Sequence, residues 1–581
     1  MRLAVVALAL TALAAPLVAA GCTDAEGQTA PPPDPAAAEA ERQAHVDSLL
    51  AAYAGFEAPP AVPDAEAFAW ADSVLATLTL EERVAQMFIV ELGAVSRPRE
   101  LAALGVGGFH VNRKTAPREA LAAVNRLQRA ARVPLFTSAD FEWGVGTATS
   151  AFTSLPSAMA YGGADDETLA EVGGAVTALE ARAMGINVLF APVADVNNNP
   201  RNPIINTRSF GSDPRRVGEL AAAYVRGAQA HGVLATLKHF PGHGNTDTDT
   251  HIDFASIGGD WDALSATELA AFRGGLEGDP ALVMSTHLWA QALDDSPTPA
   301  TFSRRALTDV LRDSLGFDGL ITTDALNMGA IRKNYRFPDR IVRPIQAGAD
   351  LVLMMLNPRD GIRAVVRAVE RGDVPRAQID ASARRILRAK GRLGLGRSAQ
   401  TDPDRLGRML AEVRGARFAD ALSRASVTVV RDGALPIRRE QRVALVQLSN
   451  FGASSAMTRL ERDLGADTSV RITRGGGGRD RAVTAARGAD VAVIAVHLRV
   501  GSDAVPRLRR AEQRAVDAVR ATGTPIVFVV LGNPYAAALA PDAAGIVVAY
   551  DKTLRTASAV ADVLTGRRAA TGRLPVTVPG I

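Results

Sequence analysis

The chain has 581 residues, of which 47% are hydrophobic and 22% charged, and its formal net charge at pH 7 is +3. This composition excludes the disordered, collagen-like and polytopic membrane classes, and the near balance of charge indicates no nucleic-acid partner. At roughly 150 residues per domain, the length predicts two to four domains. The only cysteine is Cys22, which excludes an internal disulfide framework and a thiolate zinc site.

The N-terminus has the pattern of an export signal. Residues 3–20 form an apolar run behind Arg2 and end on small side chains. Such a run is typical of a secretory signal peptide. The alternative is a permanent membrane-spanning helix, which Pro16 and the many alanines disfavour.

The end of this run resembles a bacterial lipoprotein box. Residues 19–22 read Ala-Ala-Gly-Cys, and lipidation of Cys22 would make it the first mature residue. We therefore expect residues 1–22 to be a lipoprotein signal peptide and the protein to be exported and held at the cell envelope by a lipid anchor. Ala19 stands where Leu is usual, so a soluble secreted form is the alternative. The Pro- and Ala-rich residues 23–62 predict a disordered tether.

The next part of the chain alternates between apolar runs and amphipathic stretches, which is typical of a parallel sheet with crossover helices. Eight strand–helix units favour a (β/α)₈ TIM-type barrel over an open doubly wound sheet, and no GxGxxG motif follows the first run. We place the catalytic barrel at residues 63–400 and a linker at residues 401–425. The eight predicted strands are 84–90, 106–111, 134–138, 188–193, 233–237, 281–285, 319–323 and 350–355.

The pattern then restarts, which predicts a smaller α/β sandwich domain at residues 426–581. An Arg-Gly-Gly-Gly-Gly-Arg stretch at 474–479 lacks the Lys-Ser/Thr of a phosphate-binding loop and is predicted to be a surface turn. The predicted strands of this domain are 427–430, 443–448, 491–496, 526–531 and 546–549.

Polar side chains cluster directly after the predicted barrel strands, where the loops of such a barrel form its active site. Four of the eight histidines lie between residues 238 and 287. A random scatter of surface residues would rarely give this distribution. The polar side chains that follow the strands are Asp140, Glu142, Arg208, Lys238, His239, His243, Asp249, His251, His287 and Asp324.

These residue types suit a displacement at carbon. Asp324 at a strand end offers a nucleophile, and His251 offers a proton donor. Asp249, two residues before His251, would fix the imidazole tautomer and raise its basicity if a turn brings the two together. Buried polar pairs can also hold the hydroxyl groups of a sugar, and the residues suited to this are Asp140, Arg208 and Lys238. For any one of these residues, a structural ion pair is the alternative.

Metal-binding interpretations fit poorly. His239 and His243 have the spacing of a helical zinc pair, but Pro241 between them prevents a helix. The aspartates of residues 247–253 begin like a calcium loop, but Ile252 occupies the position that requires Gly. We therefore expect neither a metal nor another cofactor.

The stretch 238–251, KHFPGHGNTDTDTH, closely resembles the hallmark of glycoside hydrolase family 3, in its β-N-acetylglucosaminidase branch. Blocks at 140–144, 208–214 and 323–329 resemble three further family motifs in the same order, and the resemblance runs from about residue 65 to the C-terminus. It implies that Asp324 is the nucleophile, His251 the general acid and base, and Asp249 its partner. The sugar-binding residues that it implies are Asp140, Arg208, Lys238 and His239.

The motifs depart from the family pattern at three positions. Thr250 replaces the usual Ser of the Asp-Ser-His motif, and Asn245 stands where Asp is frequent. Trp143 replaces a common Gly, and we expect it to reshape the sugar pocket.

The resemblance implies a retaining exo-β-N-acetylglucosaminidase (β-N-acetylhexosaminidase) that forms a covalent glycosyl-Asp intermediate. A family 3 β-glucosidase is one alternative, but many of these take their acid from a glutamate of the second domain. Here that domain offers only Glu440, Glu461 and Glu512 beyond residue 432, none in a recognisable motif. An N-acetylglucosaminide phosphorylase is another alternative, because the sequence does not separate water from phosphate as the acceptor.

Export points to glycans of the cell envelope as substrates. Peptidoglycan fragments that contain N-acetylglucosamine are the first choice, and chitin oligosaccharides are the second. Two hypotheses come from other classes of protein: a noncatalytic glycan-binding lipoprotein and a metal-dependent amidohydrolase. The latter normally has His-x-His after its first strand, which residues 88–90 lack.

Overall fold

A computed structural model describes residues 35–56, 58, 60–93, 95, 97–111, 116–353, 357–412, 415–449, 454–473, 475–498 and 506–581. The expected signal peptide, the lipidation site Cys22 and the first part of the expected tether lie outside the described residues. Within these ranges, no helix has the length and apolar character needed to cross a bilayer. The chain divides into two compact units after His45, and the second unit, Val46–Ile581, holds both large sheets and the site described below.

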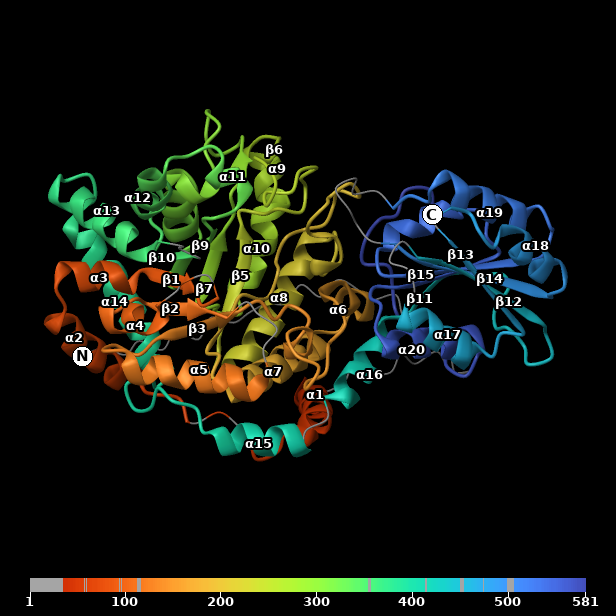
Figure 1. Cartoon of the computed structure of the whole chain (residues 1–581), viewed down its shortest axis with the longest axis horizontal. Coiled ribbons are helices and arrows are strands. Elements are labelled where there is room, and N and C mark those ends of the chain that lie inside the picture. The colour runs from red at the N-terminus through yellow and green to blue at the C-terminus, as the bar shows by residue number, and fades with distance from the viewer. Residues whose placement is uncertain are drawn as a thin grey trace, which may run out of the picture. The chain divides into compact units, whose positions relative to one another are not determined.

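Eight parallel strands close into a barrel in the order β1-β10-β9-β7-β5-β4-β3-β2 (Figure 1), which confirms the predicted fold class. The first predicted strand was too long at its start, because Val84 belongs to helix α3 (Leu80–Gln86), whose N-terminus is fixed by a capping box at Thr79. The barrel strands are β1 (Phe88–Glu91), β2 (Gly108–His110), β3 (Phe136–Ala139), β4 (Val188–Leu189), β5 (Leu234–Phe240), β7 (Leu282–Ser285), β9 (Leu320–Ala325) and β10 (Leu351–Leu353).

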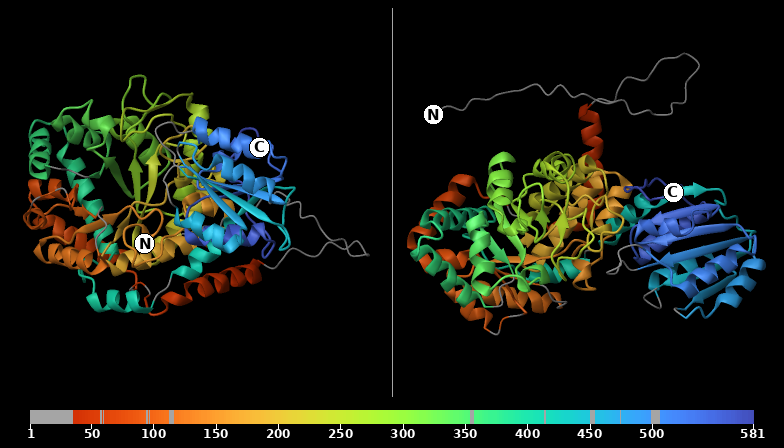
Figure 2. Two further views of the ribbon diagram at one scale, coloured as in Figure 1. Left: turned by 45° about the vertical axis from the view of Figure 1, so that its right-hand side comes forward. Right: turned by 90° about the horizontal axis from the view of Figure 1, so that it is seen from above.

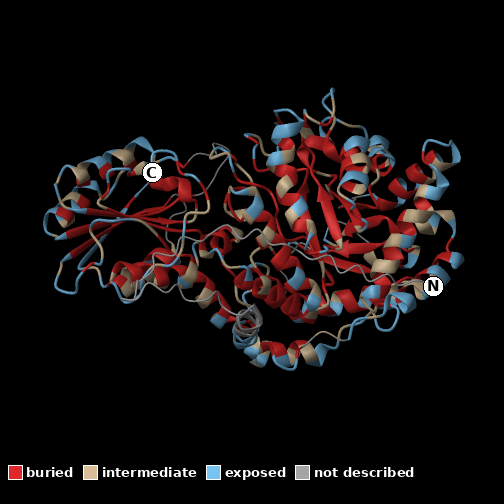
Figure 3. Ribbon diagram, turned by 180° about the vertical axis from the view of Figure 1, so that it is seen from behind, coloured by how far each residue is buried: buried red, intermediate tan, exposed pale blue. Residues whose placement is uncertain are grey.

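Helices surround the barrel with their apolar faces inward, so that the strands are buried and the outer helix faces are exposed (Figure 3). Two short strands, β6 (Ser256–Ile257) and β8 (Trp289–Ala290), pair in the loops after β5 and β7. A helix with π-type hydrogen bonds covers Arg305–Ser314. Besides α3, the other helices of this region are α2 (Asp64–Thr77), α4 (Pro98–Leu104), α5 (Pro117–Ala130), α6 (Ala158–Ala164), α7 (Glu167–Ala183), α8 (Pro214–Ala230), α9 (Trp261–Ala266), α10 (Glu268–Leu276), α11 (Gly329–Arg332), α12 (Phe337–Ala347), α13 (Pro358–Glu370) and α14 (Arg376–Arg392).

The second domain is a six-stranded sheet in the order β11-β16-β15-β14-β12-β13, parallel except for β11. Figures 1 and 2 show its twist, with α18 (Arg479–Arg487) and α19 (Arg510–Arg520) on one face and α17 (Ser455–Leu464) and α20 (Leu554–Leu564) on the other. The strands are β11 (Thr428–Asp432), β12 (Val443–Ser449), β13 (Thr468–Ile472), β14 (Val491–His497), β15 (Ile526–Leu531) and β16 (Gly545–Ala549).

Sequence analysis missed strand β13. It lies at the sheet edge, and only Val470 and Ile472 are buried, so it has no continuous apolar run. The stretch predicted as a linker is largely helical, with α15 (Pro403–Glu412) and α16 (Ala416–Ser426).

The expected tether is wrong in its second half. Helix α1 spans Pro35–Leu50 and a 3₁₀ turn follows it. Four side chains recur at intervals of three and four residues and join the hydrophobic core, which also contains Leu406 of α15; they are Val46, Leu49, Tyr53 and Phe56. This spacing gives a helix one apolar stripe. The average composition of the segment, rich in Pro and Ala, concealed the stripe.

Adjacent positions on α1 test this correction. Leu49 is buried and Ser48 is exposed. We expect Leu49→Ala to cost about 2–5 kcal/mol through lost burial and a residual cavity, and to lower the Tm clearly. Ser48→Ala should change stability by no more than about 0.5 kcal/mol. Thermal unfolding of both variants checks this, and equal Tm values would mean that this segment does not pack in solution.

Candidate active site

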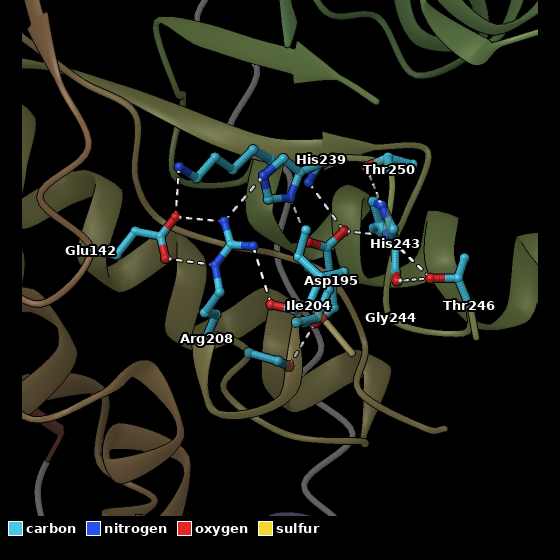
Figure 4. A network of polar contacts seen from close by, with 12 residues as sticks. Glu142, Asp195, Ile204, Arg208, His239, His243, Gly244, Thr246 and Thr250 are labelled. Carbon is cyan, nitrogen blue, oxygen red and sulfur yellow. Dashed lines mark hydrogen bonds and ion pairs between the residues drawn. The ribbon is translucent and has the colours of Figure 1, made fainter. Parts of the chain in front are cut away.

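The side chains singled out in the sequence lie at the carboxyl ends of the barrel strands or in the loops that follow. Figure 4 shows four of them, Glu142, Arg208, His239 and His243. Asp140 and Glu142 follow β3, whereas Lys238 and His239 lie within the long strand β5. Arg208 ends a 3₁₀ turn, Asn206–Arg208, between β4 and α8. Parallel strands of a barrel all present these ends on one face, so residues far apart in the sequence become neighbours.

A buried carboxylate joins two cations in this cluster. Glu142 Oε1 lies 2.7 Å from Lys238 Nζ and 2.8 Å from Arg208 Nη2, and Arg208 Nε donates to Glu142 Oε2 at 2.8 Å. Lys238 Nζ also donates to Asp140 Oδ1 at 2.9 Å. The Glu142 side chain is only 8% exposed, whereas that of Asp140 is 41% exposed. Glu142 therefore fixes the two cations in place, and Asp140 stays accessible to a ligand.

Pairing keeps this cluster charged despite its burial. Burial favours the neutral form of Glu142, but Arg208 and Lys238 outweigh it and hold the pKa of the carboxyl well below its usual range. Burial alone would lower the pKa of Lys238, but Asp140 and Glu142 raise it above its ordinary value. The site therefore presents fixed charges at neutral pH, which suits the binding of hydroxyl groups.

Asp195 is a central residue that sequence analysis did not select. It is fully buried, and its Oδ2 lies 2.7 Å from His239 Nδ1. Its Oδ1 accepts from the backbone N–H groups of His239, at 3.1 Å, and His243, at 2.7 Å. A signal was present in the sequence, because Asp195 follows the fourth predicted strand in an apolar stretch. Asp195 fixes the ring of His239, whose Nε2 faces Arg208 Nη2 at 3.4 Å.

Unlike the other histidines of the motif, His243 has both ring nitrogens in contact with hydroxyl groups of its own loop. Both its ring nitrogens contact hydroxyl groups at 2.9 Å, Nδ1 that of Thr246 and Nε2 that of Thr250. Burial lowers the pKa of His243 to about 4, so the ring is neutral at ordinary pH. His243 thus holds the loop that leads to His251. Thr250, where the family has Ser, supplies the hydroxyl for this bond.

The loop after β5 brings Asp249 and His251 together through a tight turn. Asp249 Oδ1 accepts from the backbone N–H of His251 at 2.8 Å and lies 2.9 Å from its Nδ1. The His251 side chain is 60% exposed. Its pKa is raised by the hydrogen bond to Asp249, against an opposing effect of burial, and by the charge of Asp324. This arrangement supplies an oriented imidazole whose protonated form is stabilised by Asp249 and Asp324.

Asp324 occupies the end of β9 and is partly exposed. Burial favours its neutral form, but His239, His287, the backbone N–H of Ala325 and His251 outweigh it and lower the pKa of the carboxyl. The Ala325 N–H donates to Asp324 Oδ1 at 2.7 Å. An ionised carboxylate therefore lies within electrostatic reach of the His251 imidazole.

The loop that carries His251 is seated on the segment after β9. Gly329 N–H donates to His251 O at 3.1 Å, and Ala330 N–H donates to Thr250 O at 3.2 Å. A Cβ atom on Gly329 would lie 2.5 Å from His251 O, so only glycine permits this approach. Backbone contacts thus link the loops that bear His251 and Asp324.

Two further histidines are buried beside the site, and His110 was not singled out by sequence analysis. His110 Nε2 lies 3.5 Å from Asp140 Oδ2. His287 Nε2 lies 3.0 Å from Ala325 O and so steadies the end of β9. No group of three or more metal-ligating side chains is found within the described ranges.

The role of Glu142 can be tested by removing its charge. We expect Glu142→Gln to destabilise the protein by about 3–5 kcal/mol, because Lys238 and Arg208 would then lack their shared buried counter-charge. The control is Glu167→Gln, because Glu167 pairs with Arg216 at the surface, where loss of an ion pair costs no more than about 1 kcal/mol. Thermal unfolding compares the two, and a Glu142→Gln Tm no lower than that of the control would contradict the argument.

Comparison with known proteins identifies the family of the chain. Residues 79–389 match the N-terminal domain of glycosyl hydrolase family 3, and residues 334–580 match its C-terminal domain. A "Beta-N-acetylglucosaminidase/beta-glucosidase" from Cellulomonas fimi is 32% identical over 418 residues, which cover 68% of this chain and 73% of that protein. "Beta-hexosaminidase A" from Pseudoalteromonas piscicida is 32% identical over 357 residues, 56% of this chain and 59% of that protein.

Solved structures resemble the chain over most of its length. A family 3 β-N-acetylglucosaminidase from Paenibacillus has a TM-score of 0.73 at 28% identity and covers 87% of this chain and 100% of its own. A structure titled as a β-glucoside phosphorylase has a TM-score of 0.78 at 25% identity and covers 89% of this chain and 97% of its own. The chain belongs to glycosyl hydrolase family 3 and is a glycosidase of its two-domain type.

Proposed function

We propose that this glycosidase is a retaining exo-β-N-acetylglucosaminidase, that is, a β-N-acetylhexosaminidase. The observation that carries the proposal is the Asp249–His251 pair, held on a barrel loop within electrostatic reach of the carboxylate of Asp324. An ionised carboxylate and a protonated imidazole are the nucleophile and the acid that a two-step glycoside hydrolysis requires. The relatives named as a β-N-acetylglucosaminidase/β-glucosidase and as a β-hexosaminidase support the same substrate class.

In the first step, an Asp324 oxygen attacks the anomeric carbon of the sugar. The bond to the leaving oxygen breaks, and His251 gives that oxygen its proton. In the second step, the neutral imidazole takes a proton from water, and the water oxygen displaces Asp324 from the anomeric carbon. Two displacements at one carbon leave the configuration unchanged.

The remaining residues bind and orient the sugar beside the scissile bond. We assign this role to Asp140, Arg208, Lys238 and His239. Glu142 holds Lys238 and Arg208, Asp195 holds His239, and Lys238 contacts Asp140 before the substrate arrives. Such preorganisation lowers the cost of ordering the site in the transition state.

The β-glucosidase alternative would need an acid from the second domain, and two of its three candidate glutamates are engaged elsewhere. Glu512 is 1% exposed and accepts the Arg509 N–H in a helix cap. Glu461 accepts from Gln447 Nε2 at 2.8 Å. Glu440 lies on the surface in a turn after β11. This supports His251 as the acid.

Phosphate is a second candidate acceptor. After giving up its proton, His251 is neutral and repels an anionic acceptor less than a carboxylate would. The fold relative titled as a phosphorylase favours a test of this alternative.

We further propose that the protein is exported and anchored at the cell envelope through a lipid on Cys22. The apolar run and the lipoprotein-like residues 19–22 support this. An enzyme in that place would meet peptidoglycan fragments that contain N-acetylglucosamine, and we propose these as its substrates in cell-wall turnover, with chitin oligosaccharides as the second choice.

The direct test compares hydrolysis of an aryl N-acetyl-β-glucosaminide with that of an aryl β-glucoside, each with and without added phosphate. We expect the first substrate to have the higher kcat/KM and the released sugar to be free N-acetylglucosamine. Preference for the glucoside would overturn the proposal. A sugar 1-phosphate as the main product would replace the hydrolase with a phosphorylase.

Removal of the nucleophile should abolish turnover without unfolding the protein. We expect Asp324→Asn to lower kcat on the order of 10⁴-fold, because the amide cannot form the glycosyl ester. Asp318→Asn, an exposed aspartate just before β9, is the control and should keep full activity. Steady-state assays measure both, and NMR of the first anomer released by the wild type should show the β form. An Asp324→Asn variant with full activity would place the chemistry elsewhere.

The pH profile should report the Asp249–His251 bond. Asp249 raises the pKa of His251, so the acid form persists to higher pH in the wild type. Asp249→Asn should shift the basic limb of kcat/KM to lower pH and reduce its maximum on the order of 10²-fold. The matched control is Asp247→Asn in the same loop, because Asp247 contacts Arg201 and Asn199 instead. An unchanged basic limb in Asp249→Asn would exclude this role for the pair.

A further inference from the structure

The second domain holds the loop between β4 and α8, here called the β4–α8 loop (residues 190–213). This loop provides two side chains of the site, Asp195 and Arg208. Its two flanks contact the second domain at separate points. The second domain therefore contacts a loop of the site, although the site residues themselves all lie on the barrel.

The first contact is made by Tyr535, in the 3₁₀ turn Pro534–Leu539 after β15. Its hydroxyl donates to Asn197 O at 3.1 Å and accepts from Asn197 Nδ2 at 2.9 Å. Tyr535 is 4% exposed, and burial raises the pKa of its hydroxyl to about 12, so it stays protonated and able to donate. Asn197 lies two residues beyond Asp195.

The second contact is made by Pro575, near the end of the chain. Its carbonyl oxygen accepts from Ser212 N–H at 2.8 Å. A Cβ atom on Gly211 would lie 2.5 Å from the same oxygen, so the two backbones pack without space between them. Ser212 lies four residues beyond Arg208.

Bonds within the β4–α8 loop connect these two points. Asn197 N–H donates to Gly211 O at 2.8 Å. The Ser209 hydroxyl lies 2.6 Å from Asp195 O and 2.9 Å from Gly211 O. The loop is therefore closed on itself: Asp195 lies at one end of the closed part and Arg208 lies within it, and the second domain contacts the loop at Asn197 and Ser212.

We propose that the second domain acts as a clamp on the β4–α8 loop and that Tyr535 is a positioning residue for sugar binding, acting through Asn197 and Asp195. Asp195 in turn sets the ring of His239, and the same loop sets the guanidinium of Arg208. That these two side chains bind a sugar rests on the proposed function, whereas the clamp itself does not.

The test uses Tyr535→Phe in the full chain, which removes only the hydroxyl. Tyr53→Phe is the matched control, because Tyr53 is equally buried and its hydroxyl is also hydrogen-bonded, to Glu180 at 2.7 Å. We expect Tyr535→Phe to raise the KM for an aryl N-acetyl-β-glucosaminide and the inhibition constant of free N-acetylglucosamine by about tenfold each. Its kcat should change by less than about threefold, because Asp324 and His251 lie on other loops. Tyr53→Phe should leave all three constants unchanged.

A double-mutant cycle tests whether Tyr535 acts through Asn197. Asn197→Ala should raise KM in the same direction, and the double variant should be no worse than Tyr535→Phe, because the one bond that Asn197→Ala removes, from Asn197 Nδ2, is already lost in Tyr535→Phe. Hydrogen exchange in residues 195–213 should be faster in Tyr535→Phe than in Tyr53→Phe, and this readout does not depend on the substrate. Unchanged exchange would overturn the clamp. Faster exchange with an unchanged inhibition constant would overturn the role in sugar binding alone. A wild type without glycosidase turnover would overturn the proposed function, and the exchange result would still decide the clamp.

Discussion

The site depends on one constraint, which is that charges buried at the end of the barrel must be paired. Taking a carboxylate or an ammonium group out of water costs several kcal/mol, and only close opposite charges and hydrogen bonds offset that cost. Glu142 meets this requirement for both Lys238 and Arg208. Because each member of the cluster needs the others, none can rotate away alone, and the groups stay in one geometry before any ligand binds.

The same constraint explains why Asp195 matters although it faces no open space. Its two oxygens accept from the ring of His239 and from two backbone N–H groups, so the start of the loop after β5 is fixed by one carboxylate. That carboxylate lies on a different loop, which the second domain contacts through Tyr535 and Pro575. Order in the sugar-binding half of the site thus involves both domains.

The limits of sequence analysis have physical causes. Barrel strands are buried on both faces and appear as continuous apolar runs, which is why all eight were recognised. The edge strand β13 buries alternate side chains and has no such run. The stripe of α1 depends on spacing, which an average over Pro- and Ala-rich residues hides.

Within the site, the residues of the long motif were recognisable from their order in the sequence. Asp195 and His110 were not selected, because their partners are on other strands and only the closed barrel brings them together. His243 was selected as a polar residue at a strand end, but its contacts with Thr246 and Thr250 give it a structural role. A motif shows which residues are near one another in the sequence, and the fold decides which atoms are free to meet a ligand.

The two halves of the site differ in how firmly they are held, and this difference fits a two-step reaction. Lys238 and Glu142 are nearly inaccessible and held by short ionic contacts, whereas the His251 side chain is 60% exposed and is held by Asp249 and by backbone bonds to the segment after β9. The buried half suits a sugar that must stay in place through both displacements. In the proposed mechanism the exposed half is where the leaving group departs and the acceptor enters, so the group that transfers the proton must be reachable from solvent. A carboxyl enclosed like Glu142 and held by two cations could not serve both steps, because neither the leaving group nor the water or phosphate that replaces it could reach its oxygens.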